Sequence, residues 1–314
     1  MYTKAESIAQ AVAASGEFRA GGTDVQERIR SRIAGDAIID IQWLPDLDQI
    51  EFHDDGVTIG ALTTIETIGN HERLRQEYAA LTLPTQSLAT PQIRSMGTMG
   101  GVLCQRTRCW YFRHPDLGCP KKGNASTCPA RDGNHHFGVC FDLGPCVHPH
   151  PSSIGCALLT YDAQIQVAKR GRITVADLYG DGSDPTHDHT LKPGELITHI
   201  HLPRAADGER ASYYRLMSRQ WAEWPLVEVI VRLLMDGPTI REAKIGVGGV
   251  ANIPLRLPEV EQSLAGSQVL SDTLQAAADL SVGNANPLPQ TGYKLDMVRG
   301  AVLHTLEMAL ATDE

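Results

Sequence analysis

Cysteine is the residue type whose distribution in this chain points most directly to chemistry. All seven cysteines lie between Cys104 and Cys156, and the rest of the 314-residue chain has none. Secreted disulfide scaffolds are small chains with bridges throughout. A group of cysteines within one segment of a large acidic chain is more often a metal site. The stretch therefore predicts metal binding.

The spacing of these cysteines favours an iron–sulfur cluster over zinc. Structural zinc sites usually contain close Cys-x2–4-Cys pairs. This chain has no Cys-x2-Cys, and its closest pairs are Cys104/Cys109 and Cys140/Cys146. A wrapping loop with widely spaced thiols can reach the four corners of a [4Fe–4S] cluster. Six thiols lie between Cys104 and Cys146, so the spacing alone leaves two of them spare.

Other side chains of the same stretch have simpler explanations. His135, His136, His148 and His150 could bind metal, but histidines in surface loops are more often solvated. The aromatic run Trp110–Phe112 is expected to pack over the cluster or against a neighbouring subunit. Buried unreactive thiols, or a zinc-stabilised interaction module, are the competing interpretations of the stretch.

Two motifs with paired glycines could bind a flat or anionic ligand. In the first, Ala20–Asp24, two adjacent glycines let the backbone approach a ligand and point successive amides at one anion. Thr23 adds a hydroxyl, and Asp24 is expected to cap the following helix. A simple Gly-Gly turn with a helix cap explains this motif equally well.

The second motif spans Thr90–Gly101 and again places a hydroxyl, Thr98, beside paired glycines. It lacks the strand–GxGxxG–helix arrangement of a Rossmann dinucleotide site. It is not a phosphate-binding P-loop either, because no Gly-Lys-Ser/Thr follows. Neither glycine motif identifies its ligand when taken alone.

Composition excludes several classes of function. With 28 Lys+Arg against 37 Asp+Glu, the net charge is −9, which argues against non-specific binding to nucleic acid or to anionic membranes. No run approaches the ~20 apolar residues needed to span a bilayer. The N-terminus lacks the pattern of a signal peptide, so we expect no export signal of its own. No Gly-x-Ser-x-Gly or His-Glu-x-x-His constellation occurs, which fits chemistry carried out by cofactors.

The elements that must position these motifs alternate between helices and strands, which indicates an α+β chain. The residues from about 104 to 153 have little periodicity, and a loop of that length needs something else, such as a metal cluster, to hold it. Residues 203–210 read as a linker. Strands are expected at 18–20, 37–41, 57–61, 164–168, 195–202, 226–235 and 240–247, and helices at 7–14, 64–70, 76–87, 258–265, 271–280 and 295–312.

The motifs in series resemble a known family. Ala-Gly-Gly-Thr-Asp, then Gln-Ile-Arg-x-x-Gly-Thr-x-Gly-Gly, then Gln-Arg-Thr-Arg-Cys, occur in the order found in the FAD subunit of the xanthine dehydrogenase/CO dehydrogenase family of molybdenum hydroxylases. Ile245–Ala251 and Gly292–Leu295 resemble the C-terminal domain of that flavoprotein. The cysteine insert resembles the [4Fe–4S]-carrying members, namely aldehyde oxidoreductases and 4-hydroxybenzoyl-CoA reductase.

The resemblance implies a fold and two domains. Residues 1–205 would form a two-part FAD-binding domain of the vanillyl-alcohol-oxidase (PCMH) type, with the [4Fe–4S] loop at about 104–153. Residues 211–314 would form the CO-dehydrogenase-flavoprotein C-terminal α+β domain. The flavin would lie between these two domains.

The resemblance also implies site residues. The implied FAD-binding residues are Ala20, Gly21, Gly22, Thr23, Asp24, Val25, Thr90, Thr98, Gly100, Gly101 and Ser153. The implied cluster ligands are Cys109, Cys119, Cys128 and Cys146. Cys140 competes with Cys146 for the fourth position, and Cys104 and Cys156 are expected to be packing thiols. The chain departs from the family at Val102, where Asn is usual, and at Ser153, where Asp is usual.

The function that the resemblance implies is electron transfer within a heteromeric enzyme. A large subunit with the molybdenum cofactor would act on substrate, and a small [2Fe–2S] subunit would pass electrons to the FAD of this chain. The flavin would then exchange electrons with a small-molecule acceptor. Aldehyde oxidation is the first choice and aromatic-thioester reduction the second, while a stand-alone flavin oxidase is the rival class. The expected compartment is the cytoplasm, or the periplasm if a partner subunit carries the export signal.

Overall fold

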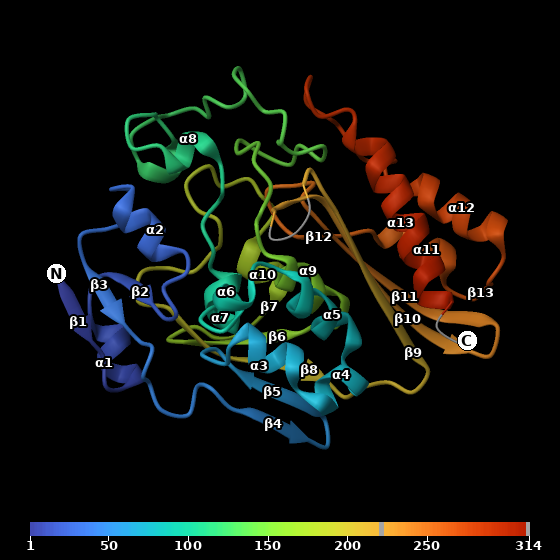
Figure 1. Ribbon diagram of the computed structural model, residues 1–314, viewed down its shortest axis with the longest axis horizontal. Helices are drawn as coiled ribbons and strands as arrows, with labels where there is room; N and C mark the ends of the chain where they lie inside the picture. The colour runs from blue at the N-terminus through green and yellow to red at the C-terminus, as the bar shows by residue number, and fades with distance from the viewer. Residues whose placement is uncertain (220–222, 312–314) are drawn as a thin grey trace.

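The computed structural model describes residues 1–219 and 223–311, and it consists of three lobes with the cysteine stretch across them (Figure 1). The first lobe holds three short parallel strands in the order β1-β3-β2, flanked by two short helices. Its small core includes Ile39, Leu44 and Leu47. The elements are β1 (Tyr2–Lys4), α1 (Ile8–Ala13), β2 (Glu17–Arg19), α2 (Val25–Arg30) and β3 (Ile38–Asp40).

The second lobe is a five-stranded antiparallel sheet, order β4-β5-β8-β6-β7, with helices on one face. Alternating apolar residues such as Ile165 and Val167 face those helices and form the largest core of the FAD-domain region. The strands are β4 (Ile50–His53), β5 (Gly56–Gly60), β6 (Gln164–Ala168), β7 (Gly171–Thr174) and β8 (Leu196–Pro203). The helices are α3 (Ile65–Asn70), α4 (Glu72–Glu77), α5 (Ala79–Ser87), α6 (Pro91–Arg94), α7 (Met99–Leu103), α9 (Ser153–Thr160) and α10 (Val175–Tyr179).

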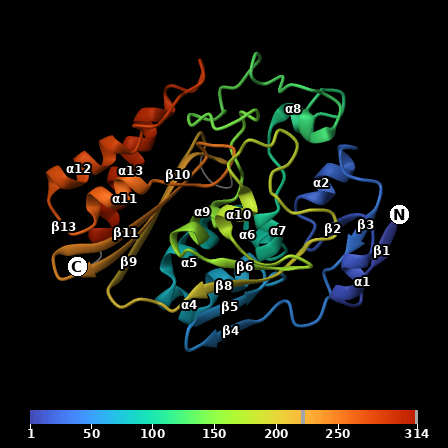
Figure 2. The same ribbon diagram turned by 180° about the vertical axis from the view of Figure 1, so that it is seen from behind.

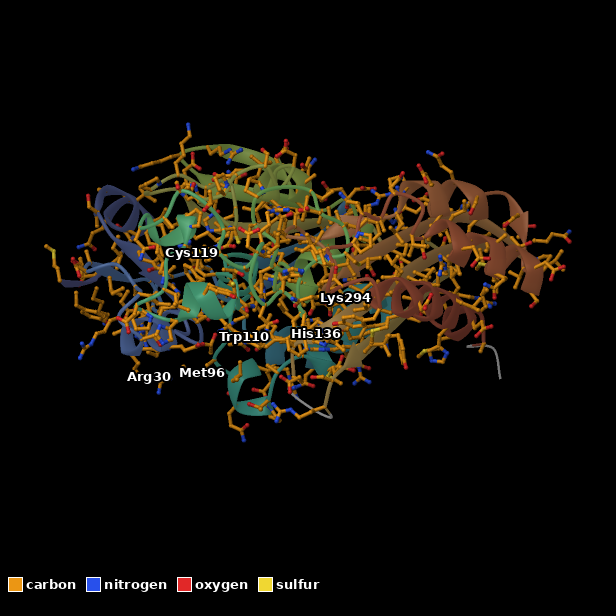
Figure 3. The ribbon with its side chains drawn as sticks, turned by 90° about the horizontal axis from the view of Figure 1, so that it is seen from above. Arg30, Met96, Trp110, Cys119, His136 and Lys294 are labelled. Carbon is orange, nitrogen blue, oxygen red and sulfur yellow. The ribbon has the colours of Figure 1, made fainter. Side chains whose placement is uncertain are left out.

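The cysteine stretch crosses the top of the molecule as a long irregular segment, drawn in green in Figure 1. Its regular structure is limited to one turn of helix, α8 (Trp110–Arg113), and one 3-10 turn, η1 (Pro120–Lys122). Viewed from above, Cys119 and Trp110 lie between Arg30 of the first lobe and Lys294 of the third (Figure 3). The stretch is therefore in a position to touch every lobe.

The third lobe is an antiparallel sheet, order β12-β11-β10-β9, with β13 pairing with β11. Helices α11 and α13 pack on one face, and α9 of the second lobe packs against β10 and β11, as the view from behind also shows (Figure 2). Its core is separate from that of the second lobe. The elements are β9 (Glu209–Met217), β10 (Pro225–Asp236), β11 (Thr239–Gly248), β12 (Leu255–Arg256), α11 (Pro258–Leu264), β13 (Ser267–Gln268), α12 (Ser271–Leu280) and α13 (Lys294–Leu310).

The predicted α+β character is confirmed, but several local predictions are wrong. Residues 203–210 are not a linker throughout, because strand β9 begins at Glu209. The sequence does not predict β9, because most of its side chains are half-buried on both faces and the apolar alternation of a strand is lost. Three shorter strands, β1, β4 and β7, were missed too, since strands of three or four residues carry little periodicity.

A buried ion pair of the third lobe lies at its seam with the second lobe. Arg232 Nε lies 2.8 Å from Glu209 Oε2, and both side chains are less than 10% exposed. Tyr161, at the end of α9, donates to the other Glu209 oxygen at 2.7 Å, and its ring lies 4.6 Å below the Arg232 guanidinium. Burial raises the pKa of Glu209 despite the opposing effect of Arg232. Removing one partner of the pair would therefore destabilise the fold, because the other charge would stay buried without a counterion.

We predict that Arg232→Met lowers the free energy of unfolding by about 3 kcal/mol, because it leaves a buried carboxylate without its cation. Urea denaturation of the full-length chain measures this change. Arg299→Met is the matched control, since Arg299 is 42% exposed and pairs with an exposed Asp296, so its removal should change stability by less than ~0.5 kcal/mol. Equal effects of the two variants would show that the seam does not depend on this pair.

Candidate cofactor sites

The first glycine turn is pressed directly against the second glycine motif. A Cβ atom at Gly21 would lie 1.6 Å from the carbonyl oxygen of Met96, so no side chain fits there. Gly22 has a φ of +75°, a conformation that favours glycine. Although about seventy residues separate the motifs in the sequence, the structure brings their backbones into contact, as predicted for a shared ligand site.

The amides of the first turn are available to a ligand. Within the described residues, none of the backbone N–H groups from Gly21 to Val25 donates to an acceptor in the protein. Buried or partly buried amides without acceptors are rare, and successive amides in a turn form an anion-binding concavity. This arrangement fits the pyrophosphate of a dinucleotide.

The second motif differs, because its amides are already used. Thr98 caps α7 and its Oγ1 accepts from the Gly101 amide at 3.3 Å, while the Gly100 amide donates to the Ala61 carbonyl at 2.8 Å. A Cβ at Gly100 would lie 3.0 Å from that of Ala61. The motif therefore offers bare backbone at close range rather than free donors. Thr90 caps the neighbouring α6, where its hydroxyl accepts from Ile93 at 3.4 Å.

Asp24 does not act as the helix cap that was expected. It occupies the cap position of α2, but its carboxylate makes no hydrogen bond to the helix amides. Instead it forms ion pairs with Arg28, Arg108 and Arg113. Burial acts to raise the pKa of Asp24, but the three guanidiniums hold it below its usual value. The carboxylate is therefore committed to arginines, two of which flank Cys109.

Ser153 lies at the first position of α9, next to the capping Ser152. It is buried close to the Tyr213 hydroxyl on β9, so it faces the seam between the second and third lobes. Val102 is buried in the core of the second lobe and presents no polar group. Of the two residues that depart from the family pattern, Ser153 therefore lies at the seam between lobes and Val102 lies in an apolar core.

The four cysteines predicted as cluster ligands lie near one another, but not at the spacing of ligands to a metal ion. Cys128 lies close enough to Cys109, Cys119 and Cys146 for their thiols to interact electrostatically, and Cys109 also interacts with Cys119. Cys109 and Cys119 share a small apolar cluster with Phe112. Among the described residues, no group of three or more His, Cys, Asp or Glu side chains is spaced for a single metal ion.

Backbone amides surround these thiols. Cys109 accepts from the amides of Phe112 and Tyr111, and comparable amide contacts reach Cys119 and Cys146. Burial nevertheless raises the pKa of Cys109 to about 11 and that of Cys146 to about 12. Binding to a metal removes the proton from a coordinating thiol. The donor set fits an iron–sulfur cluster, whose sulfurs commonly accept amide hydrogen bonds.

The other three cysteines lie elsewhere. The Cys140 amide donates to the carbonyl of Val250, and its side chain packs in the core of the third lobe. Cys156 is fully buried on α9, and Cys104 packs against the core of the second lobe. This placement separates Cys140 from Cys146, the two competitors for the fourth position.

The four histidines of the stretch each have other contacts. His135 Nδ1 lies 3.0 Å from the Ala130 carbonyl, and His148 Nδ1 lies 3.2 Å from Thr107 Oγ1. His136 stacks on Tyr293, and His150 packs edge-on against Tyr179. These contacts account for the positions of the four histidine side chains without a bound metal.

Sequence reasoning missed a buried cation beside the thiols. The Lys121 ammonium lies 2.9 Å from Asp188, which also binds Arg106 at 2.7 Å. Burial acts to raise the pKa of Asp188, but these two cations hold it well below its usual range. Lys121 also acts on Cys146 and stabilises its thiolate form. Asp188 lies far from the cysteines in the sequence, so no local pattern could reveal the contact.

Comparison with known proteins identifies the class of this chain. Residues 1–205 match the family model described as the FAD binding domain in molybdopterin dehydrogenase. Residues 212–308 match the CO dehydrogenase flavoprotein C-terminal domain. The chain therefore belongs to the FAD-binding medium subunits of the molybdenum hydroxylase family. It is a component of an oxidoreductase, and the predicted fold and enzyme class are confirmed.

Particular relatives support the same assignment. The chain is 32% identical over 319 residues to the aldehyde oxidoreductase FAD-binding subunit PaoB of Escherichia coli (strain K12), with 98% of this chain and 96% of that protein covered. It is 26% identical over 292 residues to the carbon monoxide dehydrogenase medium chain of Afipia carboxidovorans, with 89% and 84% covered. A solved Cu,Mo-CO dehydrogenase shares the fold at a TM-score of 0.77 and 22% identity, with 99% and 97% covered.

These relatives bear on the partner and cofactor predictions as well. The family consists of medium subunits of heteromeric enzymes, and FAD binding is a property of its first domain. No helix within the described residues is both long enough and apolar enough to cross a membrane. The [4Fe–4S] cluster and the individual site residues stay predictions.

We predict that Gly21→Ala abolishes FAD binding, because its Cβ would collide with the Met96 carbonyl and push the two glycine motifs apart. The flavin-to-protein absorbance ratio of the purified full-length chain should fall at least tenfold. Gly35→Ala is the control, since a Cβ at Gly35 meets no atom within 4 Å, and it should retain its flavin. Full flavin content in Gly21→Ala would show that this turn does not shape the site.

Proposed function

We propose that this chain is the FAD- and [4Fe–4S]-containing electron-transfer subunit of a heterotrimeric molybdenum hydroxylase that oxidises aldehydes. The observation that carries the proposal is that Cys128 interacts electrostatically with Cys109, Cys119 and Cys146, while the arginines on either side of Cys109 pair with Asp24 of the first glycine motif. A large molybdenum-cofactor subunit and a small [2Fe–2S] subunit would be the partners. A small-molecule acceptor would take up or supply the electrons.

Support for the cluster comes from the setting of the four thiols. All four are buried or half-buried, Cys109, Cys119 and Cys146 receive backbone amides, and the buried ammonium of Lys121 acts on Cys119 and Cys146. An anionic iron–sulfur cluster is favoured by nearby positive charge and hydrogen bonds to sulfur. Cys140 is the weaker candidate for the fourth ligand, because its amide and side chain belong to the packing of the third lobe.

The flavin would be held by residues from three lobes. The amides from Gly21 to Val25 would bind the pyrophosphate, and Thr98–Gly101 would lie along the cofactor at backbone distance. Ser153 and the seam next to it would contact the flavin end. The proposed domain boundary falls between residues 205 and 211, an interval that includes the start of β9 at Glu209.

The residues of this chain would position cofactors rather than react. Bound FAD and an iron–sulfur cluster supply the one- and two-electron chemistry. The side chains hold the carriers, exclude water from the thiols and fix local charge. No acid–base pair of this chain is assigned to substrate chemistry, which belongs to the molybdenum subunit.

Aldehydes are the favoured substrate class because the relative PaoB is named as an aldehyde oxidoreductase subunit and aligns along nearly all of this chain. Reduction of an aromatic thioester is the runner-up, suggested by the sequence Cys119-Pro120-Lys121-Lys122-Gly123. The substrate itself would be recognised by another polypeptide. Activity of the assembled complex is therefore the test that separates these two classes.

The complex purified with its two partner subunits should be yellow and contain about four irons in this chain, in addition to those of the small subunit. Adding an aldehyde without an acceptor should bleach the flavin absorbance, because electrons reach FAD and stop there. An aromatic aldehyde and a benzoyl thioester with a reductant form the two arms of the comparison. Zinc without iron, or a complex that no aldehyde reduces, would contradict the proposal.

Cys146→Ser and Cys140→Ser test the ligand set as a matched pair, because the two residues are six positions apart and both are removed from solvent. Cys146→Ser should lower the iron content of this chain to less than about half, since a cubane lacks one of its four thiolates. Cys140→Ser should retain about four irons. Iron analysis and the visible spectrum measure both, and the reverse result would assign Cys140 as the ligand.

A further inference from the structure

Three arginines and three carboxylates form a continuous ion-pair network between the first glycine turn and the cysteine stretch. Asp24 directly follows the turn, and Arg108 and Arg113 lie on either side of Cys109. The network consists of Glu17, Asp24, Glu27, Arg28, Arg108 and Arg113. Its charges balance, three against three, so it can be largely withdrawn from water.

Asp24 is the centre of this network. Arg113 Nη2 lies 2.7 Å from Asp24 Oδ1, Arg108 Nη2 lies 3.3 Å from the same oxygen, and Arg28 Nε lies 2.9 Å from Oδ2. The side chains of Asp24, Arg108 and Arg113 are 14%, 17% and 11% exposed. At this depth the ion pairs are screened less by salt than those on the surface.

Arg113 also holds the backbone that leads to Cys109. Its Nε donates to the Thr107 carbonyl at 2.9 Å, and its Nη2 donates to the Arg106 carbonyl at 2.8 Å. The same Nη2 donates to Asp24. One guanidinium thus ties the backbone just before a predicted cluster ligand to the residue just after the glycine turn.

Arg108 makes a second connection. Its Nη1 lies 2.6 Å from Glu27 on α2, and its guanidinium lies 4.6 Å from the centre of the Trp224 ring, just before β10 of the third lobe. Contacts with α2 and with the Trp224 ring therefore fix the position of the Arg108 guanidinium. A shift of Cys109 would pull on α2 and on the turn that precedes it.

We propose that Asp24, Arg108 and Arg113 couple the two cofactor sites, so that a cluster held by Cys109 preorganises the Gly21–Val25 turn for FAD. These three side chains are positioning residues that act through the turn. The inference rests on the proposed function, since it needs both cofactors in this chain. Coupling between sites is reciprocal for affinities, so bound FAD also strengthens the binding of iron, and we expect this to slow its loss to a chelator.

Removal of the cluster should therefore weaken FAD binding. We expect Cys109→Ser to raise the dissociation constant for FAD about tenfold, which is about 1.4 kcal/mol and within the usual range of coupling energies. Saturating FAD should also slow the release of iron to a chelator in the wild-type chain. Quenching of flavin fluorescence measures the first quantity, and absorbance of the iron–chelator complex measures the second.

A double-mutant cycle in the full-length chain tests the coupling. Asp24→Asn should weaken FAD binding by itself, and adding Cys109→Ser in that background should change the dissociation constant less than about twofold. Asp142→Asn is the control, because it breaks a 2.7 Å ion pair with Arg131 inside the same stretch but away from the glycine turn. In the Asp142→Asn background, Cys109→Ser should keep its full tenfold effect.

Additive effects of Asp24→Asn and Cys109→Ser would overturn the coupling, as would an iron release rate that FAD leaves unchanged. If Asp24→Asn gives little folded protein, Arg113→Lys replaces it, since lysine keeps the charge but cannot join the two carbonyls and Asp24 at once. If the wild-type chain binds both cofactors but shows no coupling between them, only this inference is contradicted. A wild-type chain without iron sinks the proposed function as well.

Discussion

The structure depends on how a stretch of about fifty residues without a core of its own is held in place. Ordering that many residues carries a large entropic cost, and the apolar clusters within the stretch are small. It is fastened instead by polar contacts to all three lobes. Arg113 binds Asp24 in the first lobe, Lys121 binds Asp188 in the second, and Thr291 of the third donates to the Val139 carbonyl.

The sequence predicts the parts of this molecule that rest on local pattern. Long buried strands such as β10 and the C-terminal helix α13 are predicted within a few residues, because their apolar side chains recur at the expected period. Strand β9 was missed since its two faces are equally half-buried. The role of Asp24 was also missed. Its position before a helix suggests a helix cap. The carboxylate instead forms ion pairs with Arg108 and Arg113, which are distant in the chain, and such contacts cannot be recognised from the local sequence.

The two glycine motifs have similar sequences but differ in the hydrogen bonding of their backbone amides. In both, the absence of Cβ lets backbone meet backbone, at Met96 for Gly21 and at Ala61 for Gly100. Only the first turn keeps its amides free within the described residues. In the second motif, the amides of the paired glycines donate to acceptors within the protein, and the glycines pack closely against neighbouring backbone. A motif search treats the two alike, while the hydrogen-bond pattern shows that only the first turn has amides without acceptors among the described residues.

The placement of Cys140 has a consequence for the order of biosynthesis. The amides of Cys140 and Phe141 both donate to Val250, and that of His150 donates to Ala251, so the backbone on both sides of Cys146 is anchored to a segment made about a hundred residues later. A nascent chain that ends before this segment cannot fix the last thiol of the set. The backbone around Cys146 therefore reaches its folded position only after most of the polypeptide has been synthesised.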